Sequence, residues 1–188
     1  TSAYGWFNVF LLMLIFGGII LDKLGVRMTG LGAATVMVIG TAIKYWAVST
    51  DSLEGQTLFG LDAQVLWASI GFAIFAIGVE VAGITVSKII VKWFKGKELA
   101  TAMGMEMAMA RIGTALALGF SVPIAKATGA VDVSRPVLVA LIGLCIGLIS
   151  FIVYVMMDKK LDASEATGLV EEKNPEDEFK LSDIGKIL

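Results

Sequence analysis

A glutamate and an arginine inside two successive hydrophobic runs are the residues best suited to chemistry in this chain. A short cationic loop, residues 92–98, joins the two runs. Glu80 lies twelve residues before the loop's first lysine, and Arg111 lies thirteen residues after its closing glutamate. At 1.5 Å rise per helical residue, both lie roughly 18–20 Å from the loop. A hydrocarbon core is about 30 Å thick, so neither side chain easily reaches the surface, and buried ionisable groups usually mark a substrate or ion path.

The composition places these two residues in a membrane. Hydrophobic residues make up 57% of the chain and charged residues only 17%, which is outside the range of soluble domains. Five apolar stretches are long enough for spanning helices, whereas barrel strands would be about half as long and alternating. The sequence therefore predicts an all-α, multi-pass membrane protein. The predicted spans are 3–21, 30–49, 65–91, 99–125 and 136–157.

No enzymatic, metal or cofactor site is predicted. The chain has no histidine, and its single cysteine, Cys145, is expected to be a small packing residue in the last span. One cysteine cannot form a disulfide within the chain. No phosphate loop, catalytic triad or metal-ligand spacing occurs, and the net charge of −2 gives no indication of nucleic-acid binding. Because the chain starts without methionine at the mouth of a span, we interpret it as a piece of a longer protein.

The distribution of basic residues predicts the topology. Lys23 and Arg27 follow the first span, and the loop 92–98 carries three lysines, whereas the segment 50–64 has no basic residue. The positive-inside rule therefore places the start of the chain outside and the tail, residues 158–188, in the cytoplasm.

Residues 1–157 form the predicted transmembrane bundle, and the composition shifts after it. The acidic stretch 162–178 contains Pro175 and is predicted to be a loop. In residues 179–188, charged and apolar residues alternate at near-helical spacing, which predicts a short interfacial helix.

A second motif lies in the turn after the first span. It comprises a glycine, an aspartate four residues later, a basic residue, a second glycine and a further basic residue: Gly18, Asp22, Lys23, Gly25 and Arg27. The pattern resembles the signature of the major facilitator superfamily between its second and third helices, although Val26 replaces one of the usual basic residues. In that family the loop helps to hold the two halves of the transporter together. Asp22 could accept hydrogen bonds from backbone N–H groups or from a basic partner. An ordinary cytoplasmic turn is the alternative.

Other segments narrow the resemblance to the lysosomal dipeptide transporter branch of the superfamily and its bacterial relatives. They are residues 2–6 with Asn8, 93–99, 109–113 and 180–183. The resemblance implies that the five spans correspond to helices two to six of a twelve-helix fold, a partial N-terminal bundle. The remaining half of the same transporter would then be its partner.

Within that branch, Glu80 and Arg111 match positions implicated in holding the two ends of a dipeptide. The chemistry agrees, because a dipeptide presents an ammonium and a carboxylate at most ~7 Å apart along its backbone. A carboxylate can bind the ammonium, and a guanidinium can bind the carboxylate through two parallel hydrogen bonds. The alternative is that Glu80 and Arg111 only pair with each other as a structural bridge.

Three further residues, Glu106, Tyr4 and Asn8, are candidates for a role in the path. Glu106 lies roughly 12 Å from the cytoplasmic start of its run. It could line the path, act as a protonatable carboxylate, or point into a polar contact between helices. Tyr4 and Asn8 are candidate polar groups of the cavity. Lys44 lies near the end of its span and is expected to snorkel to the surface, as is Lys88.

We therefore predict a secondary transporter of dipeptides or short peptides that works by alternating access of two bundles around a midplane site. One alternative keeps the fold and changes the solute to another small charged molecule, such as an organic anion or amino acid. The other is a non-transporting membrane anchor, which would have no need of Glu80 and Arg111. We favour a bacterial inner membrane over a lysosomal one. Proton coupling, oligomeric state and any accessory subunit are left open.

Overall fold

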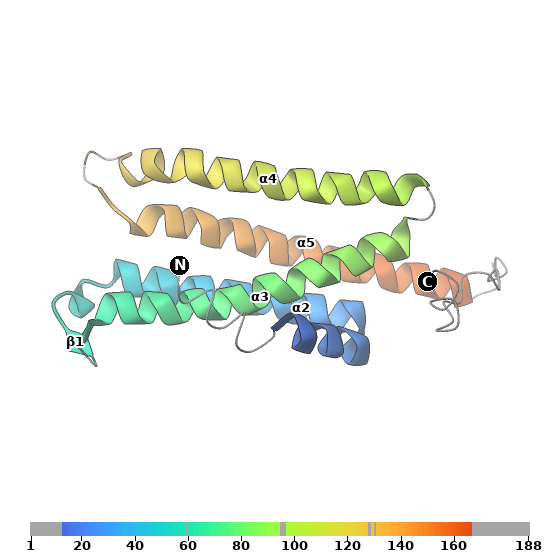
Figure 1. Ribbon diagram of the computed structural model, residues 1–188, viewed down its shortest axis with the longest axis horizontal. Coiled ribbons are helices and arrows are strands. Elements are labelled where there is room, and N and C mark those ends of the chain that lie inside the picture. The colour runs from blue at the N-terminus through green and yellow to red at the C-terminus, as the bar shows by residue number, and fades with distance from the viewer. Residues whose placement is uncertain (1–12, 59, 95–96, 128, 130, 167–188) are drawn as a thin grey trace, which may run out of the picture. The chain divides into compact units, whose positions relative to one another are not determined.

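The computed structural model describes residues 13–58, 60–94, 97–127, 129 and 131–166. Four of the helices in this part of the chain are long and apolar enough to cross a membrane. In chain order (Figure 1) the elements are α2 (Met13–Ser49), η1 (Asp51–Leu53), β1 (Thr57–Leu58), β2 (Leu61–Asp62), α3 (Ala63–Trp93), α4 (Lys97–Ala125) and α5 (Ser134–Ala166).

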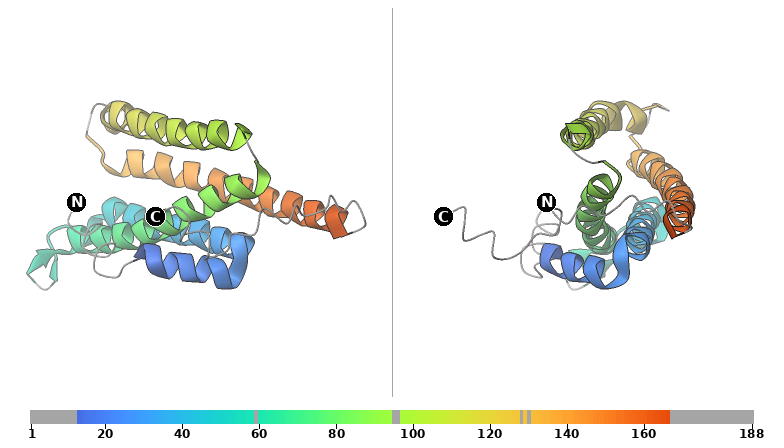
Figure 2. Two further views of the ribbon diagram at one scale, coloured as in Figure 1. Left: turned by 45° about the vertical axis from the view of Figure 1, so that its right-hand side comes forward. Right: turned by 90° about the vertical axis from the view of Figure 1, so that its right-hand side faces the viewer.

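Helix α2 is broken at Gly25, and its first part (dark blue) turns away from the rest (Figure 2). Gly25 has φ 76° and ψ 168°, a left-handed conformation that glycine adopts without a steric penalty. The Thr29 hydroxyl donates to the Ile20 carbonyl across the break, at 3.5 Å. The break separates the end of the first predicted span from the second span. Residues 1–12, which hold the rest of the first span, lie outside the described residues.

The last three helices contain the last three predicted spans, but α5 is longer than predicted. The helix continues to Ala166, so the prediction that a loop begins at Asp162 is wrong for the segment 162–166. The residues after the apolar run are lysine, leucine, alanine and glutamate for the most part, and these favour a helix in water as well as in lipid. By its contacts the chain divides into two units within α5, one ending at Ile152 and one starting at Val153. The predicted interfacial helix at 179–188 lies outside the described residues.

Helices α2 and α3 pack through small residues that recur every seven positions. A seven-residue repeat keeps its members on one face of a pair of packed helices. On each helix these residues are buried, and together we call them the small-residue seam: Ala33, Gly40 and Ala47 on α2, and Gly71, Gly78 and Thr85 on α3.

At the seam the two backbones touch. A Cβ on Gly40 would lie 2.7 Å from the carbonyl oxygen of Gly71, and a Cβ on Gly71 would lie 2.7 Å from the carbonyl oxygen of Gly40. A Cβ on Gly78 would lie 2.9 Å from the carbonyl oxygen of Ala33. Such distances are shorter than real Cβ contacts, so these positions accept only glycine. In a membrane the hydrophobic effect does not favour association of helices. Small residues favour it instead, because they let the backbones approach closely.

A short extramembrane structure connects α2 to α3. Strands β1 and β2 form an antiparallel hairpin that pairs Thr57 with Asp62, and Asp62 then caps α3 by accepting from the Gln64 N–H at 2.9 Å. At the same end of the pair, the rings of Trp46 and Trp67 meet edge to face at 5.9 Å. Amphipathic aromatic rings gather at membrane–water interfaces, so this end of the α2–α3 pair has the character of a membrane surface.

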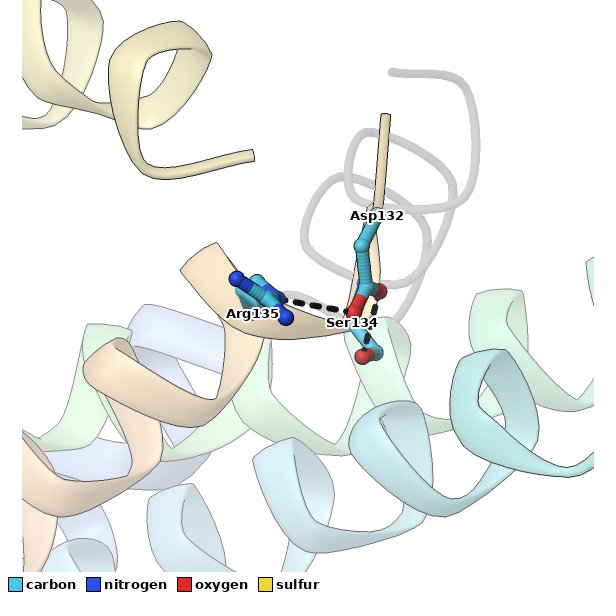
Figure 3. Close-up of polar contacts among 3 residues, drawn as sticks. All are labelled: Asp132, Ser134 and Arg135. Carbon is cyan, nitrogen blue, oxygen red and sulfur yellow. Dashed lines mark hydrogen bonds and ion pairs between the residues drawn. The ribbon is translucent and has the colours of Figure 1, made fainter. Parts of the chain in front are cut away.

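The first turn of α5 is stabilised by a carboxylate in the preceding loop (Figure 3). Asp132 accepts from the Ser134 backbone N–H at 2.9 Å and from the Ser134 hydroxyl at 2.6 Å. Its second oxygen accepts from Arg135 Nε at 3.0 Å. The hydrogen bonds from Ser134, followed by that from Arg135, lower the pKa of Asp132 below its ordinary 3.8, because all of them favour the charged form. The negative charge also suits the positive end of the helix dipole.

Substituting glycines inside and outside the seam should have opposite effects on stability. Gly40→Ala and Gly78→Ala should lower the thermal unfolding midpoint by the equivalent of about 1–3 kcal/mol, because the added methyl group meets backbone. Gly32→Ala and Gly83→Ala are matched controls on the same helices, where an added Cβ meets nothing within 4 Å. Alanine favours helix by up to about 1 kcal/mol, so the controls should be neutral or stabilised. Equal effects at all four positions would contradict the close approach.

The contribution of Asp132 to stability should depend on pH. A carboxylate whose pKa is lowered in the folded state stabilises above the unfolded-state value, and this contribution disappears as the pH falls through the folded-state pKa. Asp132→Ala should therefore unfold at a lower temperature than the wild type at pH 7, and the difference should shrink as the pH drops below 3.8. Asp51→Ala is the control, since the Asp51 side chain accepts no hydrogen bond within the described residues. A pH-independent difference would show that the charge is not responsible.

Candidate functional site

Glu80 lies near the middle of α3. It follows Gly78 of the seam by two residues, which places it about 200° around the helix from Gly78. The side chain is partly buried. Glu80 therefore lies on the face of α3 opposite the small-residue seam.

Arg111 lies near the middle of α4, and its side chain is exposed. Within the described residues Arg111 makes no hydrogen bond or ion pair, so it is not joined to Glu80. The alternative in which Glu80 and Arg111 form a salt bridge with each other is therefore not seen in this structure. Both charges lie at mid-helix positions on successive helices, as their sequence spacing predicted.

Glu106 is engaged in a contact between helices. Its carboxylate accepts a hydrogen bond from the Ser87 hydroxyl of α3 at 3.2 Å. The same hydroxyl lies 3.2 Å from the carbonyl oxygen of Gly83, one turn earlier in α3. One of the three roles considered for Glu106 was a polar contact between helices, and the structure contains such a contact. The other two candidate polar groups, Tyr4 and Asn8, lie outside the described residues.

The glycine–aspartate motif connects the first part of α2 to α3. Lys88 Nζ of α3 donates a hydrogen bond of 2.7 Å to the Asp22 carboxylate, and the two side chains form an ion pair. Gly25 supplies the break in α2, Gly18 has no atom near its Cβ position, and Lys23 is exposed. Sequence reasoning expected Asp22 to accept from backbone N–H groups or from a basic partner, and it did not identify Lys88. The available signal was that both charges lie near the same predicted membrane surface.

A cavity of about 1060 Å³ lies between the helices of the first unit. Its walls are mostly apolar or small, and residues beside Arg111 in the sequence contribute to them, namely Ala110, Gly113 and Thr114 of α4. Sites for small molecules have volumes of roughly 300–1,000 Å³ and a few polar groups among apolar walls. The cavity is therefore large enough to hold a solute the size of a dipeptide.

The ion pair between Asp22 and Lys88 should contribute little to the stability of the folded protein. Their side chains are 75% and 46% exposed, and exposed ion pairs contribute about 0–1 kcal/mol. In a charge-reversal cycle, Asp22→Lys and Lys88→Asp should each lower the unfolding midpoint, and the double variant should recover most of the loss. Lys23→Asp is the control, because Lys23 makes no ion pair within the described residues. Strictly additive losses in the double variant would show that the pair does not form.

Comparisons with known proteins agree on one family. The chain matches the Major Facilitator Superfamily over residues 1–183. The lysosomal dipeptide transporter MFSD1 of Danio rerio is 36% identical over 115 residues, which cover 59% of this chain and 21% of the relative. The human protein of the same name is 33% identical with the same coverage. That of Gallus gallus is 43% identical over 63 residues, 32% of this chain and 14% of the relative.

No solved structure matches the chain. The matched segment spans about a fifth of the length of the curated relatives. The match to the superfamily nevertheless covers nearly the whole chain, and the membrane-length helices and the glycine–aspartate motif around Gly25 agree with it. The chain therefore belongs to the major facilitator superfamily and is a multi-pass integral membrane protein.

Proposed function

We propose that the full-length protein is a secondary transporter that moves dipeptides or short peptides across a membrane by alternating access. The observation that carries this proposal is the presence of Glu80 and Arg111 at mid-helix positions of α3 and α4, with no ion pair between them in the described residues. Ionisable groups at such depth are costly unless they serve a path or a ligand. The relatives are named lysosomal dipeptide transporters, which supports the same solute class.

In this proposal each charge binds one end of the peptide. Arg111 binds the terminal carboxylate, because a planar guanidinium can donate two parallel hydrogen bonds to it. Glu80 binds the terminal ammonium, since a carboxylate offers acceptors only. The two groups together require both ends of the peptide to be free and charged.

The described helices would form part of one of the two bundles that rock about the site. The Asp22–Lys88 pair and the Ser87–Glu106 hydrogen bond tie α3 to its two neighbours, α2 and α4. Tyr4 and Asn8 remain proposed cavity groups. The preference for a bacterial inner membrane stays a prediction, as does the orientation with the start of the chain outside.

Substituting Arg111 with lysine should lower peptide affinity without lowering the stability of the folded protein. Arg111→Lys keeps the positive charge and loses the planar fork, so peptide affinity should fall more than tenfold, the equivalent of about 1.5–3 kcal/mol for a charge-assisted hydrogen bond. Glu80→Gln should weaken binding of peptides with a free N-terminus, and N-acetylated peptides should bind poorly to the wild type. Affinity is measured on the purified full-length protein, alongside its unfolding midpoint.

Two matched substitutions control for general effects. Arg135→Lys makes the same change in the loop-side first turn of α5, and Glu98→Gln makes the same change in the exposed first turn of α4. Both should leave peptide affinity unchanged. Normal affinity in a stably folded Arg111→Lys protein would end the assignment of Arg111 to the carboxylate. If the wild type binds no dipeptide but binds another small charged solute, the proposed substrate class is wrong, and the assignment of Glu80 and Arg111 to the binding site still holds.

A further inference from the structure

Lys44 is a cation inside a membrane-length helix, and its side chain lies against α3. Its side chain is partly buried, and its Nζ lies over the ring of Phe72, 5.0 Å from the ring centroid. The small-residue seam causes this placement. Where Gly40 and Gly71 bring the backbones together, a Cβ on Gly71 would lie 2.7 Å from the Lys44 backbone nitrogen, so the lysine starts directly beside α3.

The lysine lines the cavity of about 1060 Å³ described above, and among the residues that line it Lys44 is the one that carries a charge. Two lining threonines, Thr41 and Thr114, donate their hydroxyl hydrogens to carbonyl oxygens of their own helices at 2.9 and 3.0 Å. Their hydrogens are therefore committed. The Lys44 ammonium, with three donors and no acceptor, is the strongest hydrogen-bond donor that the wall offers to a solute.

The surroundings of this ammonium favour an anion. Within the described residues Lys44 has no hydrogen bond and no ion-pair partner, and Phe72 supplies a cation–π contact. A cation–π contact offsets only part of the cost of removing an ammonium from water. A carboxylate that entered the cavity would provide the missing opposite charge.

We propose that Lys44 recognises a second carboxylate of the solute and so gives the transporter a preference for peptides with an acidic side chain. The proposal rests on the proposed function, in which Arg111 already binds the terminal carboxylate. The cavity wall supports it, because Lys44 of α2 and the neighbours of Arg111 in α4, Ala110 and Thr114, line the same space. An acidic side chain gains the ammonium as a partner, whereas a basic side chain is repelled by it.

The test uses the full-length protein in proteoliposomes and three dipeptides that differ in one side chain: Ala-Glu, Ala-Gln and Ala-Lys. The wild type should take up Ala-Glu most efficiently and Ala-Lys least. Lys44→Met keeps an apolar stem and removes the charge, so Ala-Glu uptake should fall about tenfold while Ala-Gln uptake changes less than about twofold. Lys44→Arg should keep the preference for Ala-Glu. Lys126→Met, which removes an exposed lysine from the loop after α4, should change nothing.

Equal losses for Ala-Glu and Ala-Gln in a folded Lys44→Met protein would overturn the proposal, because they would assign Lys44 a structural role. If Lys44→Met does not fold, the order of the three dipeptides in the wild type decides, and equal uptake of Ala-Glu and Ala-Gln overturns it.

If the wild type takes up no dipeptide, the proposed function fails, and the carboxylate site is tested by binding alone. N-acetylglutamate should then raise the unfolding midpoint of the wild type more than N-acetylglutamine does, and Lys44→Met should abolish the difference. No difference in the wild type would overturn the assignment.

Discussion

The contact between the backbones of α2 and α3 is the constraint on which the rest of the first unit depends. Gly40 and Gly71 leave no room for even a methyl group between the two helices. At this point the separation of the two helices is set by direct contact between their backbones. Small residues at seven-residue spacing achieve this in lipid, where burial of apolar surface gives no net drive to associate.

The close packing of this pair determines where the charged side chains lie. With the seam on one face of α3, Glu80 lies on the opposite face of that helix. The close approach also brings Lys44 beside Phe72 at one end of the pair. Toward the other end, Lys88 reaches Asp22 in the first part of α2. Between α3 and α4 the Ser87 hydroxyl donates a hydrogen bond to the Glu106 carboxylate.

Much of the fold could be predicted from the sequence, because hydrophobic length is a strong signal in membrane proteins. The spans 65–91 and 99–125 lie within α3 and α4, and the motif glycine Gly25 breaks the helix where a turn was expected. The hairpin after α2 was missed, since its strands are two residues long and depend on local hydrogen bonds. The contact between Lys44 and Phe72 was not predicted either. It depends on how closely two helices approach, and hydropathy contains no information about that distance.

The hydroxyl of Ser87 has one hydrogen and two acceptors at the same 3.2 Å, the Glu106 carboxylate on α4 and the Gly83 carbonyl on its own helix. Breaking a hydrogen bond between helices normally leaves a donor unsatisfied, at a cost of about 1–3 kcal/mol. Here the hydrogen can rotate to the carbonyl, so on the α3 side this contact opens without that cost. The Ser87 hydroxyl can therefore stay hydrogen-bonded within α3 when the Glu106 carboxylate is out of reach.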